Sequence, residues 1–380
     1  MIEKNVKIKI GENMMNNKKK KIIIIGIGLL LILIILGISY YIFIVKKETT
    51  PTPTKPEKEP EPVIEKKLTI YDEDSNQRPI AIMIDNNVGN DSHSGLQDSY
   101  LNYEIIVEGG LTRIMAIYKD KDLAQIGPVR SSRHYFLDYA LESDCIYTHF
   151  GWSTYAENDI RTLGVNNING LYDSYPFWRS THLYAPHNVF TSISKIYEYA
   201  AQKNYRTTSD NWKLLKYTPD ELNLNTPIRY DVVENPETGK KEKVPVTMEG
   251  LTQASSIEIP YSNYQTRSYI YDENNKYYLR FMNGIPHTDA DSKMQYHYKN
   301  IIIAYVNNYQ LDSYGRQDLN TTGTGQGYYI TNGYALPINW TKSSRHDKTK
   351  YTYSNGEEIT LNDGNTFVQI VPSNRQVTIQ

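Results

Sequence analysis

The chain has 380 residues, enough for two ordinary domains and accessory segments, and its formal net charge at pH 7 is −2. Its single cysteine, Cys145, excludes an internal disulfide, and the apolar run around it favours a buried structural thiol. Residues 68–380 carry 36 acidic and 28 basic residues, so nucleic acid is not an expected partner.

The N-terminal segment separates charged from apolar residues. Residues 1–21 contain seven lysines and two glutamates, and residues 22–45 form an uncharged, mostly apolar run. As a helix rising about 1.5 Å per residue, that run would span a hydrocarbon core of about 30 Å. It is longer than a signal-peptide core, lacks a small-residue cleavage site and has no cysteine at its end for lipid attachment. We therefore expect a basic tail at residues 1–21 and a retained transmembrane anchor at residues 22–45.

Flanking charges predict the topology of this anchor. The lysines before the span outnumber Lys46 and Lys47 behind it, which places the N-terminus in the cytoplasm and the bulk of the chain outside a cell membrane crossed once. Residues 46–67 mix proline with glutamate and lysine and cannot bury a core, so they are expected to form a semi-rigid stalk.

Residues 68–225 are expected to form an α/β domain. Apolar runs predict strands at residues 78–85, 111–118 and 145–150. Helical patterns are expected at residues 128–143, where Pro128 takes the first helical position, and at residues 156–163 and 190–203. Residues 100–107 fit either a helix or a strand. Alternating strands and helices are typical of an α/β layer.

From residue 226 onward the helical periodicity disappears. Short β-branched and tyrosine-rich runs are separated by turn signals such as Asn283-Gly284, Asn332-Gly333 and Asn355-Gly356. This pattern predicts a mainly antiparallel β domain at residues 226–380. The overall fold class is therefore α+β/α/β, a membrane-anchored ectodomain with an α/β N-terminal domain and a β-rich C-terminal domain.

One set of polar residues follows the expected strand ends and helix start, where ligands bind in open α/β sheets. The candidate site comprises Asp85, Glu104, Glu108, Arg113, Arg130, Arg133 and His149. Arginines in the first turns of a helix oppose its dipole, so Arg130 and Arg133 call for an anionic partner. That partner is either a bound phosphate, pyrophosphate or acidic glycan, or a carboxylate of the chain itself. We expect Arg130 to pair internally and Arg133 to lie at the rim of the pocket.

Other motifs predict less. His182 and His187 are spaced unlike a helical metal pair and favour a structural role in an aromatic loop. The segment HTDAD, with His287, Asp289 and Asp291, offers oxygen ligands but lacks the glycine and distal glutamate of a calcium loop. The segment GTGQG at residues 323–327 lacks a phosphate-loop lysine and fits a hairpin, and Trp340 could contact a glycan or cover a sheet edge. No metal and no cofactor are expected, and no catalytic residue can be assigned.

Three stretches together resemble a known family. RPIAIMIDN, SGLQDSYLNYEIIVEGGLTRIMAIY and IGPVRSSRHYF are similar to the YerB-like lipoproteins of bacteria, and NGYALPINWTK with GNTFVQIVP resembles their second, β-rich domain. The resemblance implies a membrane-tethered envelope protein and no established reaction. This chain departs from the lipoprotein pattern in having an apolar span in place of a lipid-modified cysteine.

Three function classes remain open at this level. The first is an extracytoplasmic binding module for an anionic or glycan envelope ligand, such as cell-wall glycan, or for an envelope protein. The second is an enzyme acting on a phosphorylated or lipid-linked glycan, which would need arginines in an open cleft beside an unpaired carboxylate. The third is a structural scaffold.

Overall fold

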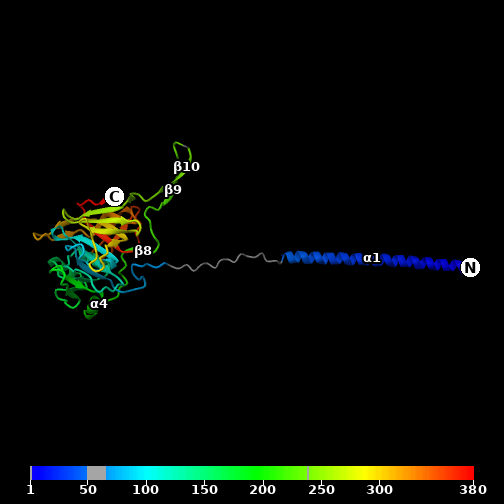
Figure 1. Ribbon diagram of the computed structural model, residues 1–380, viewed down its shortest axis with the longest axis horizontal. Coiled ribbons are helices and arrows are strands. Elements are labelled where there is room, and N and C mark those ends of the chain that lie inside the picture. Colours follow the sequence, from blue (N-terminus) through cyan, green and yellow to red (C-terminus); the bar gives the residue numbers. More distant parts are fainter. Residues whose placement is uncertain (1, 49–65, 238) are drawn as a thin grey trace. The chain divides into compact units, whose positions relative to one another are not determined.

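The N-terminal segment forms one long helix, α1 (Ile2–Glu48), in the computed structural model, which describes residues 2–48, 66–237 and 239–380. Within α1, Asn16–Lys46 is long and apolar enough to cross a membrane. The predicted stalk at residues 46–67 lies mostly outside the described residues. The chain divides into two units, Met1–Glu65 and Lys66–Gln380, which Figure 1 shows in sequence colours.

A mixed sheet of 11 strands, counted over the described residues, is the centre of the second unit. Its strands are, in spatial order, β11 (Thr252–Gln253), β21 (Tyr334–Lys342), β20 (Gly323–Thr331), β17 (Asn300–Val306), β24 (Thr366–Pro372), β2 (Leu101–Ile106), β3 (Thr112–Tyr118), β1 (Ile80–Asp85), β4 (Ile146–His149) and β5 (Asn167–Asn169), with β22 (Lys350–Thr352) paired to β21. Every residue of β1, β2, β3 and β24 is buried, so both faces of the middle of this sheet are covered.

A second sheet packs onto the first. It contains β15 (Ile285–Pro286), β14 (Tyr277–Met282), β13 (Thr266–Asp272), β12 (Ser256–Pro260) and β25 (Thr378–Ile379), with β16 (His297–Tyr298) paired to β14. Burial alternates along β14, as a strand with one covered face requires. The inner side chains of the second sheet reach the main sheet. For example, the Gln369 side chain of β24 donates to the hydroxyl of Tyr269 on β13 at 2.9 Å.

The strand β24, near the C-terminus, joins the two halves of the sequence. It pairs in parallel with β2 on one side and with β17 on the other. The expected division at residue 225 therefore does not separate two compact units, because strands from both stretches alternate within one sheet and share one core. Between the halves, β9 (Arg229–Glu234) and β10 (Lys241–Val246) form an exposed hairpin that projects from the body in Figure 1.

Three groups of ion pairs link acids of the first half to bases of the second. Glu104 contacts Arg267 and Arg280, with Nε–Oε1 and Nη2–Oε2 distances of 2.6 and 2.7 Å. Lys342 Nζ lies 2.7 Å from Glu142 Oε2, and both side chains are fully buried. The third group joins Arg345 to Asp138 and Asp159. These contacts stabilise the shared core across the predicted boundary.

Most predicted strands are present, and the molecule is rich in β-structure with a few helices. The ambiguous segment at residues 100–107 is the strand β2. The helices α3 (Thr154–Thr162) and α4 (Ile193–Gln202) confirm two predictions, and β4–α3–β5 is a parallel βαβ unit. The remaining short strands are β6 (Phe177–Arg179), β7 (Val189–Thr191), β8 (Lys216–Thr218), β18 (Asn308–Gln310), β19 (Gln317–Leu319) and β23 (Thr360–Asn362).

The helix predicted from Pro128 is wrong over its first half. Only α2 (Phe136–Glu142) is helical, and the residues before it run beside β1. The Arg130 amide donates to the Met83 carbonyl, and the Asp85 amide donates to the Pro128 carbonyl, both at 2.8 Å. Because these backbone groups bond to a neighbouring strand, the helical ladder cannot form there.

Candidate functional site

Six side chains meet where β1 ends and β3 begins, and we call them the arginine cluster. Its members are Asp85, Glu108, Arg113, Arg130, Arg133 and His187. Asp85 and Arg113 are register partners on the antiparallel strands β1 and β3. The extended segment before α2 brings the other two arginines alongside.

Arg133 is the better paired of the two arginines on that segment. Its Nε and Nη2 donate to Glu108 Oε1 and Oε2 at 2.5 and 2.9 Å, a bidentate arrangement. Burial opposes ionisation of Glu108, but the hydrogen bond and charge of Arg133 outweigh it and lower the pKa of the carboxyl. Arg133, which the sequence placed at the rim of the pocket, therefore has an internal carboxylate partner.

Arg130 is more weakly held. Its Nε lies 3.0 Å from Asp85 Oδ2, yet among the described residues no acceptor meets this buried nitrogen with hydrogen-bond geometry. The side chain retains 23% of its accessible surface. Asp85 Oδ2 instead receives a hydrogen bond from His187 Nδ1 at 2.6 Å. The internal partner expected for Arg130 is present, but it is shared with a histidine.

Arg113 adds a third positive charge to the arginine cluster. Its Nη1 donates to the carbonyl of Ser131 at 2.7 Å. Burial, followed by repulsion from Arg133, lowers the pKa of Arg113 to about 10, so the guanidinium stays charged at neutral pH. Three guanidiniums thus face two carboxylates, and the excess positive charge and unused donors suit an anionic ligand.

Glu104 does not belong to this cluster, contrary to the prediction. It is fully buried and accepts hydrogen bonds from Arg267, Arg280, Thr112 and Asn86, at 2.6 to 2.7 Å. Burial opposes its ionisation, but the two arginines lower its pKa below the ordinary value. Glu104 is the counter-charge that holds the second sheet on β2. It belongs to an internal arginine–carboxylate network, one of the two alternatives that the sequence left open.

A buried chain of hydrogen bonds connects that network to Asp85. Arg280 Nη1 donates to His287 Nδ1, so the neutral ring of His287 carries its proton on Nε2. His287 Nε2 then donates to His93 Nδ1 at 2.8 Å, and His93 Nε2 donates to the Asp85 carbonyl at 2.5 Å. Burial lowers the pKa of His93 to about 4 and that of His287 well below its usual value, consistent with neutral rings. This series of hydrogen bonds positions the end of β1.

His149 lies apart from the arginine cluster, although the sequence placed it at the same rim. It is fully buried, and its ring nitrogens contact the Gly151 carbonyl at 2.8 Å and Asn167 Oδ1 at 3.3 Å. Burial lowers its pKa to about 4. His149 therefore supports the end of β4 and the turn that follows.

Sequence reasoning did not assign His187 or His93 to this region. His187 is 102 residues from Asp85 along the chain, and no local spacing relates the two. In the calcium candidate HTDAD, Asp289 caps its own turn by accepting from the amides of Asp291 and Ser292. Over the described residues, no group of three or more His, Cys, Asp or Glu side chains could hold a metal ion.

Comparison with known proteins places the chain in a family. Models of the N-terminal and C-terminal domains of the protein of unknown function DUF3048 match residues 68–206 and 257–368. A relative from Bacillus subtilis (strain 168), "Putative lipoprotein YerB", is 28% identical over 302 residues, which are 78% of this chain and 82% of the relative. The chain belongs to this YerB-like family.

A solved member of the YerB-like family has the same fold. The crystal structure of the YerB protein from Bacillus subtilis matches with a TM-score of 0.65 and 25% identity, covering 80% of this chain and 94% of that one. The lipoprotein name of the relative and the apolar helix α1 both support membrane anchoring at the cell envelope. Membership confirms the resemblance carried by the strand and turn motifs and brings no known reaction with it.

Proposed function

We propose that this protein is an extracytoplasmic, membrane-anchored module that binds an anionic envelope ligand at the arginine cluster. The ligand class is phosphate, pyrophosphate or the acidic group of a wall glycan. The single observation that carries the proposal is the excess of three guanidiniums over two carboxylates, with Arg130 lacking a well-aligned acceptor among the described residues. Guanidiniums in such an arrangement bind phosphate and carboxylate oxygens strongly.

The proposed orientation places residues 46–380 outside the cell. Its support is the lysine-rich segment before the apolar helix and the weaker positive charge behind it. Protease added to intact cells should degrade the C-terminal unit and leave an N-terminal tag protected. Loss of that tag in intact cells would exclude this topology.

An enzyme that acts on a phosphorylated glycan receives less support. Such an enzyme needs a carboxylate or another base that is free to act on the substrate. Asp85 and Glu108 both face guanidiniums, at 3.0 and 2.5 Å. A purely structural role would not explain why the arginine cluster contains one more guanidinium than carboxylates.

Calorimetric titration of the full-length protein with inorganic pyrophosphate tests anion binding. We expect Arg130→Ala to weaken the affinity at least tenfold, because it removes the least compensated charge. Arg229→Ala, which removes an exposed arginine from the β9–β10 hairpin, is the matched control and should bind as the wild type does. Equal binding by wild type and Arg130→Ala, or no binding by either, would contradict the proposal.

A further inference from the structure

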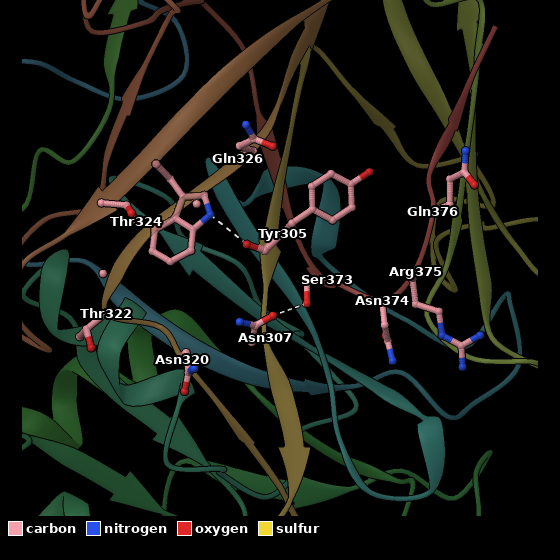
Figure 2. Close-up of a pocket in the computed structure, with 13 residues that line it drawn as sticks. Tyr305, Asn307, Asn320, Thr322, Thr324, Gln326, Ser373, Asn374, Arg375 and Gln376 are labelled. Carbon is pink, nitrogen blue, oxygen red and sulfur yellow. Dashed lines mark hydrogen bonds between the residues drawn. The ribbon is translucent and has the colours of Figure 1, made fainter.

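A groove of about 780 Å³ lies in the second half of the sequence, between β20, β17 and the turn after β24. Figure 2 shows Tyr305 and Asn307 in its middle, the segment from Asn320 to Gln326 on one side, and Asn374 to Gln376 on the other. Its volume falls within the roughly 300–1,000 Å³ typical of small-molecule sites.

The lining has an unusual chemical composition. Five of its side chains are carboxamides, four carry hydroxyl groups, one is Arg375, and none of the described residues that line it is a carboxylate. Carboxamides and hydroxyls both donate and accept hydrogen bonds, as do the hydroxyl groups of a sugar. A polyanion would need more than one cation.

Most of the carboxamides are free to bind. Over the described residues, the side chains of Asn320, Gln326, Asn374 and Gln376 make no hydrogen bond within the protein, and all four line the groove. Only Asn307 is engaged, because Ser373 donates to its Oδ1. The groove therefore offers both donors and acceptors on opposite sides.

The floor of the groove is fixed by an aromatic side chain over a glycine. Trp340 Nε1 donates to the Tyr305 carbonyl at 3.0 Å, which holds the indole in place. Gly325 is the register partner of Trp340, and a Cβ at Gly325 would lie 2.4 Å from Nε1, so only glycine fits beneath the indole. A hypothetical Cβ at Gly323 has no heavy atom within 4 Å, which leaves the space above β20 open.

We propose that this groove binds an oligosaccharide, with a neutral or carboxylate-bearing sugar favoured over an amine-bearing one. Free carboxamides on both walls would bond the sugar hydroxyls, and the half-exposed ring of Tyr305 would contact an apolar sugar face. Arg375, whose Nη1 bonds Asn263 at 3.1 Å, would favour an acidic substituent. The site shares no residue with the arginine cluster and does not depend on the function proposed for it.

Saturation-transfer NMR and calorimetry on the full-length protein in a detergent without a sugar headgroup test this site. The probes are tetra-N-acetylchitotetraose, cellotetraose and tetragalacturonate. We expect at least one probe to bind, and Gln326→Ala combined with Asn374→Ala to weaken it at least tenfold. Thr324→Trp, an exposed position on β20, should fill the groove and block binding without disturbing the core.

Gln202→Ala, which removes an exposed carboxamide at the end of α4, is the matched control and should bind within twofold of the wild type. Arg375→Ala should weaken the acidic probe more than the neutral ones. Failure of all three probes to bind, or binding that Gln326→Ala/Asn374→Ala and Thr324→Trp leave unchanged, would overturn the proposal.

Discussion

At the scale of single residues, Arg130 and Arg133 lie only three positions apart in the sequence but have different roles. The Arg133 guanidinium donates through Nε and Nη2 to Glu108 and through Nη1 to the Ser132 carbonyl. The Arg130 guanidinium has one contact, to Asp85, without hydrogen-bond alignment. A charge in a bidentate pair contributes to stability, and a poorly compensated charge is available to a ligand.

Substitution of each arginine should separate these roles. Arg133→Ala strands the half-buried Glu108 and should lower the free energy of unfolding by about 2 kcal/mol. Arg130→Ala should lower it by less than Arg133→Ala does, because Asp85 keeps its hydrogen bonds from His187 and from the Asn87 amide. Urea unfolding at neutral pH measures both values. Equal losses in the two variants would show that the pairing described here is incorrect.

At the scale of elements, strands were easier to predict than the segment that carries the site. The strands β1, β3 and β4 could be predicted because each is a run of mostly apolar residues in the local sequence. The extended conformation of residues 128–133 depends on hydrogen bonds to distant strands, such as the bond from the Val129 amide to the Val189 carbonyl, which no local sequence pattern contains. Pro337 lies within β21 at a position that neither β11 nor β22 pairs with, so its missing amide costs no hydrogen bond on that side.

Only part of the candidate site could be predicted, because some of its contacts also depend on residues distant in the sequence. Asp85, Glu108 and the three arginines come together because strand ends and the following segments converge. Glu104 follows Tyr103 on β2 and therefore points to the opposite face, toward the second sheet, which the sequence did not connect to it. His187 could not be assigned because its contact with Asp85 is made only by the folded loop.

The buried histidines that connect β14 and β15 with β1 predict acid sensitivity. The folded-state pKa of His93 is about 4, below an unfolded value near 6.5, so the unfolded chain takes up protons first as the pH falls. The associated stability is fully present above pH 6.5 and is lost as the pH falls toward 4, by up to about 1.4 kcal/mol per pH unit for each such histidine.

Unfolding measured by denaturant at pH 7.0, 6.0 and 5.0 should show this decline. His287→Gln removes one proton-binding ring and should be less stable at pH 7.0 but less sensitive to pH. An unchanged slope in that variant would mean that His287 does not contribute to the acid sensitivity.

At the scale of the whole molecule, the second unit should behave as one cooperative body. β24 lies between strands of both halves, and fully buried ion pairs such as Glu142–Lys342 cross between them. The exposed β9–β10 hairpin is the connection most open to proteolysis. We expect limited trypsin treatment to cut at Lys240 or Lys241 and to leave the two fragments associated.

Denaturing gels should then show two fragments, while native size-exclusion chromatography should show one species that elutes like the uncut protein. Separation of the fragments under native conditions would contradict a shared core.

The anion site is tested most directly by crystals of this protein soaked in selenate, whose anomalous scattering locates the bound anion. The account predicts a selenate within hydrogen-bond distance of the guanidiniums of Arg113 and Arg130, and its absence in Arg130→Ala crystals. Selenate that binds only elsewhere, or only ordered water at these guanidiniums under saturating selenate, would contradict it.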